Sequence, residues 1–88
     1  MKAHELLADP ASWIQGMYAS DENGYWVSVK SDLAVKFCLV GALCRCYKDE
    51  HEACNKVRAA IKQELAYWND RPERTHAEVI AVLKELDL

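Results

Sequence analysis

The segment from residue 32 to residue 47 constrains the fold most, because it is the most apolar part of the chain. Between Leu33 and Cys44 the only charged side chain is Lys36. A helix that is apolar nearly all round must be covered on most of its sides, so the pattern predicts a buried central helix over 32–47. Ser31 or Asp32 would cap it. One side of this helix would let a neighbouring backbone approach closely, because it carries small residues: Ala34, Cys38, Gly41 and Ala42.

The composition is that of one small globular domain, residues 1–88. Hydrophobic residues make up 51% of the 88 positions and charged residues 28%, which excludes a disordered chain. The net charge of −3 argues against a nucleic-acid binder that neutralises phosphates. No apolar run reaches the ~20 residues of a membrane span, and the N-terminus has no signal-peptide core. We therefore expect a cytoplasmic protein that does not contact membranes.

The N-terminal third predicts a short helix and a β-hairpin. Residues 3–8 have a helical pattern, which Pro10 ends because proline disfavours helix in the residue before it. Residues 13–19 and 25–29 are rich in aromatic and β-branched side chains and flank a polar connection that contains glycine. Such a pattern is typical of a hairpin, and two short strands need helices to pack against.

The next segment predicts an amphipathic helix over 50–68. Asp49 and Glu52 have the spacing of an N-terminal capping box. Apolar side chains recur every three or four residues as far as Trp68, which we expect to be buried. Glu64 interrupts this pattern, because on a continuous helix it would lie inside the apolar stripe. A carboxylate there needs a partner, which makes Glu64 a candidate functional residue.

The C-terminal segment predicts a last helix from Thr75 to about Asp87. Thr75 and Glu78 form a T-x-x-E capping box, in which each side chain accepts a hydrogen bond from the other residue's backbone N–H. The whole chain is therefore expected to be mainly α, with three main helices, a short N-terminal helix and a small β-hairpin.

The four cysteines favour no catalytic or metal site. Without an export signal, free thiols are expected. A cluster of Cys44, Cys46, His51 and Cys54 would suit zinc chemically, but its spacing fits no usual ligand pattern, so neither metal nor cofactor is expected. Cys38 has no neighbouring histidine to deprotonate it, and the chain has no nucleophile or phosphate-binding motif. We expect a protein that is not an enzyme.

A set of motifs in fixed order resembles a known pattern. The pattern is a Trp near the N-terminus, a Cys-x-x-Gly-Ala-Leu helix, a Trp-Asn-Asp sequence, a Thr, and a Glu-Val pair. Here it is carried by Trp13, Cys38, Gly41, Ala42, Leu43, Trp68, Asn69, Asp70, Thr75, Glu78 and Val79. The chain thus resembles a family of small uncharacterised proteins encoded by bacteria and their phages. The resemblance implies a phage or prophage product, and by analogy one that binds and blocks a host protein, including host defence machinery.

Two groups of residues are candidates for binding. Trp68, Asn69 and Asp70 either fill the core and shape the turn after a helix, or form a polar site beside an aromatic surface, with Glu64 and Arg71 or Arg74 as further polar groups. Tyr18, Tyr25 and Trp26 are of the type that anchors interfaces, although such rings also serve to hold a hairpin on helices.

Three functions follow as hypotheses. The first is a non-enzymatic interaction protein that binds and inhibits a host protein. The second is a binder of a small molecule or nucleotide signal, held between helices or across a homodimer. The third is a metal-binding module that uses the cysteines.

Overall fold

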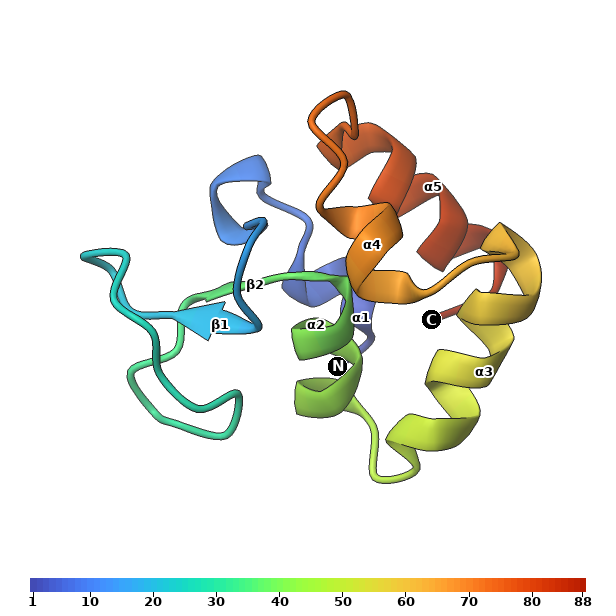
Figure 1. Ribbon diagram of the computed structural model, residues 1–88. Helices are drawn as coiled ribbons and strands as arrows, with labels where there is room; N and C mark the ends of the chain where they lie inside the picture. The colour runs from blue at the N-terminus through green and yellow to red at the C-terminus, as the bar shows by residue number, and fades with distance from the viewer.

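The computed structural model describes all 88 residues and is mainly helical, with one small antiparallel sheet (Figure 1). The prediction of a mainly α fold with a small β component is confirmed. In chain order the elements are α1 (Ala3–Leu6), a 3₁₀ turn (Pro10–Ser12), β1 (Ala19–Ser20), β2 (Lys36–Phe37), α2 (Leu39–Cys46), α3 (Glu50–Ile61), α4 (Leu65–Asn69) and α5 (His76–Glu85).

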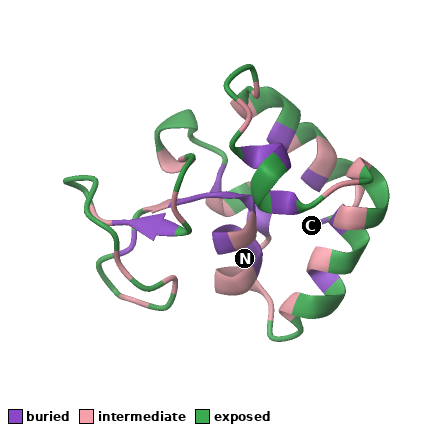
Figure 2. Cartoon of the chain, viewed as in Figure 1, coloured by how far each residue is buried: buried purple, intermediate pink, exposed green.

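The helices gather around one core, and an arm extends from them. Residues 16–36, which include β1, form the arm that projects to the left in Figure 1. The core is a single cluster of 15 buried residues to which α1, α2, α3, α4 and α5 all contribute. Most of the arm outside β1 is exposed or half-buried (Figure 2). No helix has both the length and the apolarity needed to cross a membrane.

The expected helix over 32–47 is wrong in its first half. Helix α2 starts at Leu39, and Cys38 is its N-cap, with its Sγ accepting a hydrogen bond from the Gly41 N–H at 3.3 Å. Neither Ser31 nor Asp32 therefore caps the helix. The apolar residues before Cys38 form β2 and an exposed turn instead, because a short apolar run suits a strand as well as a helix.

The hairpin turn lies where it was expected, but the sheet pairs differently. The Asp21 carboxylate accepts the Asn23 and Tyr25 N–H groups, and Gly24 has a φ of 86°. The two sides of the expected hairpin form no ladder: beside the turn they share an isolated bridge, Ser20 with Trp26, and the Val27 N–H donates to the Ala19 carbonyl at 3.2 Å. Strand β1 pairs instead with β2, in the register Ala19–Phe37 and Ser20–Lys36. The arm is thereby attached to the segment that leads into α2.

The expected helix over 50–68 is two helices. Asp49 caps α3 as predicted, since its carboxylate accepts the Glu52 N–H at 3.0 Å. The chain then leaves the helix at Lys62, which has a left-handed φ of 60°. Helix α4 starts after Glu64 in a new direction, so Glu64 no longer lies in the apolar stripe. Trp68 is buried, with 7% of its surface exposed, which confirms the prediction for this side chain.

The capping box of α5 is present as predicted. Thr75 Oγ1 accepts the Glu78 N–H at 3.2 Å, and Glu78 Oε1 accepts the Thr75 N–H at 2.9 Å. The Thr75 N–H lowers the pKa of the Glu78 carboxyl. Helix α5 ends at Glu85, two residues before the expected end, and packs against α1 and α3.

We expect Thr75→Ala to lower the free energy of unfolding by ~1 kcal/mol, because it removes the side-chain acceptor at the N-cap. Chemical denaturation measures the change. Thr75→Ser is the control, since it keeps the hydroxyl and should stay close to wild type. Equal stability of the alanine variant and wild type would show that this cap contributes nothing.

Candidate functional site

Asn69, the last residue of α4, is fully buried and joins three segments that are distant in sequence. Its Oδ1 accepts the Trp13 indole N–H at 2.7 Å and the Leu39 backbone N–H at 3.1 Å. Its Nδ2 donates to the Ile14 carbonyl at 3.1 Å and to Asp70 Oδ1 at 2.9 Å. All four hydrogen-bonding positions of the amide are therefore used inside the protein.

The residues on either side of this contact reinforce it. Gln15 Nε2 donates to the carbonyls of Asn69 and Arg71, at 2.9 and 2.8 Å. Asp70 Oδ1 accepts the Gly16 N–H at 3.0 Å. The N-terminal segment is thus held against the end of α4 through both side-chain and backbone groups.

The start of α2 is capped from two directions. The first N–H groups of a helix have no partner within the helix. Here Cys38 Sγ takes the Gly41 N–H and Asn69 Oδ1 takes the Leu39 N–H. Burial raises the pKa of the Cys38 thiol, and the negative charge of the nearby Asp70 raises it too. The hydrogen bond from the Gly41 N–H lowers this pKa, but burial outweighs it, so Cys38 caps the helix as a neutral thiol.

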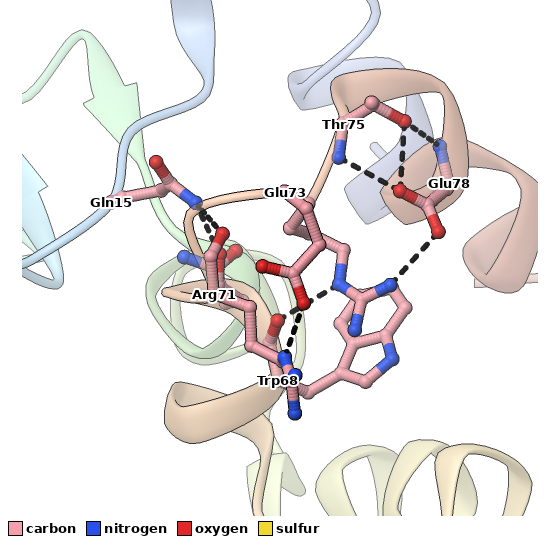
Figure 3. A network of polar contacts seen from close by, with 8 residues as sticks. Gln15, Trp68, Arg71, Glu73, Thr75 and Glu78 are labelled. Carbon is pink, nitrogen blue, oxygen red and sulfur yellow. Dashed lines mark hydrogen bonds and ion pairs between the residues drawn. The ribbon is translucent and has the colours of Figure 1, made fainter.

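Trp68 is covered by a guanidinium. The Arg74 Cζ lies 3.9 Å from the centroid of the Trp68 ring, and Arg74 Nε donates to the Trp68 carbonyl at 2.9 Å. Arg74 also pairs with Glu78 at 2.9 Å, which joins this stack to the capping box of α5. Figure 3 shows the hydrogen bonds between Thr75 and Glu78, and Gln15 pointing to the backbone of Arg71. These contacts give Trp68 a structural role.

The arm and the α4 region border an open pocket of about 350 Å³. Tyr18 and Trp26 from the arm line it, together with Ala66 and Asp70 from the α4 region. Cys38 lines it too and is buried. Most of the Trp26 surface, 66%, is exposed. The pocket therefore combines aromatic walls with one carboxylate.

A second pocket of about 410 Å³ adjoins the first and shares Ala66 and Asp70 with it. The Arg71 guanidinium lies 5.6 Å from the Tyr67 ring centroid in this pocket and pairs with Glu73 at 2.8 Å. We call the two pockets together the Asp70 groove. Its lining residues are Gly16, Met17, Tyr18, Trp26, Cys38, Ala66, Tyr67, Asp70, Arg71 and Pro72.

Comparison with known proteins places the chain in a family. A family model described as a family of unknown function (DUF6197) matches residues 1–86. The chain belongs to the DUF6197 family. No curated protein matches the chain. No solved structure matches it either.

In this DUF6197 chain the predicted site residues divide into three groups. Trp26, Asp70 and Arg71 line the Asp70 groove. Trp68 and Asn69 are buried beneath it and hold the fold. Tyr25 is exposed at the tip of the arm, and Glu64 is exposed before α4; neither lines the groove.

Several groove residues were missed from the sequence, among them Tyr67 and Ala66. Tyr67 precedes the buried Trp68 in α4 and is 63% exposed. Since neighbouring helix positions point about 100° apart, a buried Trp68 already implied that Tyr67 faces another direction. Ala66 carried no signal, because its place in the groove depends on how the arm meets α4.

Glu64 lies on the surface and outside the groove. Its side chain is 73% exposed and pairs with Arg58 Nε at 3.1 Å. It makes no capping hydrogen bond to α4, although it occupies the N-cap position. The interpretation of Glu64 as a carboxylate on an apolar face is wrong, because the chain turns at Lys62 and carries Glu64 out to solvent.

We expect Glu64→Gln to change the free energy of unfolding by less than ~1 kcal/mol, because exposed ion pairs contribute little. It should also leave binding at the Asp70 groove unchanged. Denaturation curves of Glu64→Gln, with Arg58→Gln as the matched partner variant, check the first point. A loss well above that size would mean that the pair is more shielded from solvent than its exposure indicates.

The four cysteines are unpaired, and none belongs to a group of three or more potential ligands that could hold a metal ion. Burial raises the pKa of Cys46 and Cys54, and burial together with Glu50 raises that of Cys44 to about 11. The structure therefore gives no support to the metal-module hypothesis.

At pH 8 we expect iodoacetamide to modify every cysteine more slowly in the native protein than in urea. The thiolate is the reactive form, and a raised pKa leaves less thiolate at a given pH. Modification should accelerate as the pH rises, and Cys44 should need the most alkaline conditions. Peptide mass spectrometry follows each site. A cysteine that reacts faster in the native protein would contradict the expected order.

Proposed function

We propose that this DUF6197 protein is a non-enzymatic interaction protein that binds a partner protein through the Asp70 groove and the adjoining arm. The observation that carries the proposal is where its large apolar side chains are exposed. All of them except Met1 lie on the arm or on α4: Tyr18, Tyr25, Trp26, Leu33, Val35 and Tyr67. Exposed apolar side chains gathered on one part of a surface mark interaction sites, and Trp and Tyr are the usual anchors.

The arm is held in place before any partner binds. Arg45 of α2 donates to the carbonyls of Val29 and Ser31, each at 2.8 Å, and its guanidinium lies 5.7 Å from the Phe37 ring centroid. Lys30 Nζ donates to the Cys44 carbonyl at 2.7 Å. A preorganised surface loses less conformational entropy on binding, which favours a role in recognition.

The resemblance to proteins of bacteria and phages supports a narrower form of the proposal. The protein is then a phage or prophage product that acts in the host cytoplasm. Its partner is a host protein, such as a component of a defence system, and it inhibits that protein by stoichiometric binding without catalysing a reaction.

Affinity capture with tagged wild type and variants tests the proposal. Wild type should retain a specific protein from a host lysate, and Trp26→Ala should lose it. Glu85→Ala, an exposed change on α5 outside the groove, is the matched control and should bind as wild type does. The captured protein is then purified, and calorimetry should show binding to Trp26→Ala weakened by at least about tenfold. Equal affinity for wild type and Trp26→Ala would contradict the proposal.

The second candidate function, binding of a small molecule, is supported by the size of the groove. Pockets that take small ligands commonly have volumes from ~300 Å³ upward, and the pocket between Tyr18 and Trp26 reaches about 350 Å³. Native mass spectrometry of the purified protein distinguishes the candidates. A metabolite that copurifies with wild type and is absent from Trp26→Ala would favour this function.

A further inference from the structure

The carboxylate of Asp70 is oriented by the fold but has no cationic partner. Both of its hydrogen bonds, from the Gly16 N–H and Asn69 Nδ2, end on Oδ1. Asp70 takes part in none of the five ion pairs of the protein. Its negative charge is therefore fixed in the groove and available to a ligand.

The nearby arginines are already occupied. Arg71 pairs with Glu73 and covers the Tyr67 ring. Arg74 pairs with Glu78 and covers Trp68. Since neither makes an ion pair with Asp70, a cation at this carboxylate has to come from outside the protein.

The walls of the first pocket suit the rest of a basic side chain. Tyr18 and Trp26 line it, and aromatic rings attract ammonium and guanidinium groups that approach their faces within ~6 Å. Met17, Ala66 and the buried Cys38 complete an otherwise apolar lining. The alkyl stems of Lys and Arg pack well on such surfaces while their charged ends reach a polar group.

We infer that the pocket between Tyr18 and Trp26 takes one basic side chain, lysine or arginine, of the partner protein, with its charge on the Asp70 carboxylate. This rests on the proposed function and names the chemistry that the partner must present. The net charge of −3 favours the approach of a basic surface. The partner's charged end replaces water at the Asp70 oxygen that accepts no hydrogen bond from the protein.

The test titrates ¹⁵N-labelled protein with three blocked amino acids and follows the amide and indole signals by NMR. The probes are the N-acetyl methylamides of arginine, lysine and citrulline; citrulline keeps the shape of arginine without its charge. Both basic probes should cause saturable shifts at Gly16, Met17, Trp26 and Ala66 that weaken as salt is added. Citrulline should not. Equal shifts with citrulline, or shifts outside the groove, would overturn the inference.

Asp70→Asn is the deciding variant, because it removes the charge and keeps an oxygen that can accept from Gly16 and Asn69. Binding of the arginine probe should weaken about tenfold, as expected for a hydrogen bond that loses its charge. Glu85→Gln, which removes a charge elsewhere, should bind as wild type. If Asp70→Asn binds the probe unchanged, the inference is wrong. If that variant does not fold, the contrast between arginine and citrulline on wild type decides.

The two proposals fail in different ways. Suppose that a captured partner fails to bind Trp26→Ala but binds Asp70→Asn as tightly as wild type. The protein is then an interaction protein, and the inference that the pocket takes a basic side chain is wrong. If the basic probes bind in the groove but no partner depends on Trp26, the pocket has the chemistry inferred here and the proposed function fails.

Discussion

Replacing Asn69 by alanine is expected to lower the free energy of unfolding by about 3 kcal/mol or more. The change removes all four hydrogen bonds of the amide at once. The Leu39 N–H and the Ile14 carbonyl lose their side-chain partner, and so does the Trp13 indole N–H. A buried group left without a partner costs ~1–3 kcal/mol, and the separate costs do not simply add. Urea denaturation followed by circular dichroism measures the loss.

Asn55→Ala is the matched control. Asn55 lies exposed on α3, where its Oδ1 accepts from Arg58 Nη1 at the surface. Alanine has the higher helix propensity, so this variant should be as stable as wild type or slightly more stable. If Asn69→Ala and Asn55→Ala were equally stable, the buried amide would not hold the three segments together.

The elements that the sequence predicted well are those with local signals. The capping box of Thr75 and Glu78 lies within one helical turn, as does the Asp49 cap of α3, and both are present. The burial of Trp68 follows from the spacing of apolar residues around it. Such signals depend on residues three or four positions apart, and no tertiary contact has to be known to interpret them.

The elements that were mispredicted depend on contacts between distant residues. The N-terminus of α2 is fixed by Cys38 and by Asn69, and Asn69 lies thirty positions after Leu39, so the apolar run alone could not show where the helix starts. The break between α3 and α4 lies at Lys62, a residue type that gives no warning of a left-handed conformation. The β1–β2 pairing likewise joins segments on either side of a long loop.

The candidate site shows the same division. Asp70, Arg71 and Trp26 were identified because their types suit binding, and the structure brings them to one groove. The role of Asn69 was left open, because its partners lie about 55 positions away. Several residues that carry the family resemblance meet at this point: Trp13, Cys38, Gly41, Asn69 and Asp70. The hydrogen bonds among these residues and their neighbours hold the start of α2 against the end of α4.

Gly41→Ala is expected to lower the free energy of unfolding by at least ~2 kcal/mol, and Gly41→Leu by more. Two effects of opposite sign compete. Alanine inside a helix is favoured over glycine by ~1 kcal/mol. Against this, a Cβ on Gly41 would lie 2.9 Å from the Tyr18 carbonyl carbon and still closer to its oxygen. The Tyr18 backbone cannot move aside as a flexible side chain can, so the cost of overpacking exceeds the gain in helix propensity.

The clash at Gly41 should also affect the groove, because Tyr18 lines it. The Tyr18 carbonyl accepts the Cys38 N–H at 3.2 Å, and the next residue, Ala19, starts β1. Pushing Tyr18 away from α2 breaks that bond and displaces one aromatic wall of the pocket. Gly41→Ala should therefore weaken partner binding as well as stability.

Gly24→Ala separates steric clash from backbone strain. Gly24 has a φ of 86° and nothing within 4 Å of an added Cβ, so alanine there should cost only the ~1–2 kcal/mol of a left-handed conformation. It lies at the arm's turn, far in sequence from α2. Thermal or urea denaturation of both variants shows whether Gly41→Ala lowers or raises the free energy of unfolding. A Gly41→Ala protein more stable than wild type would show that helix propensity outweighs the contact with Tyr18, and that β1 can move away from α2 at little cost.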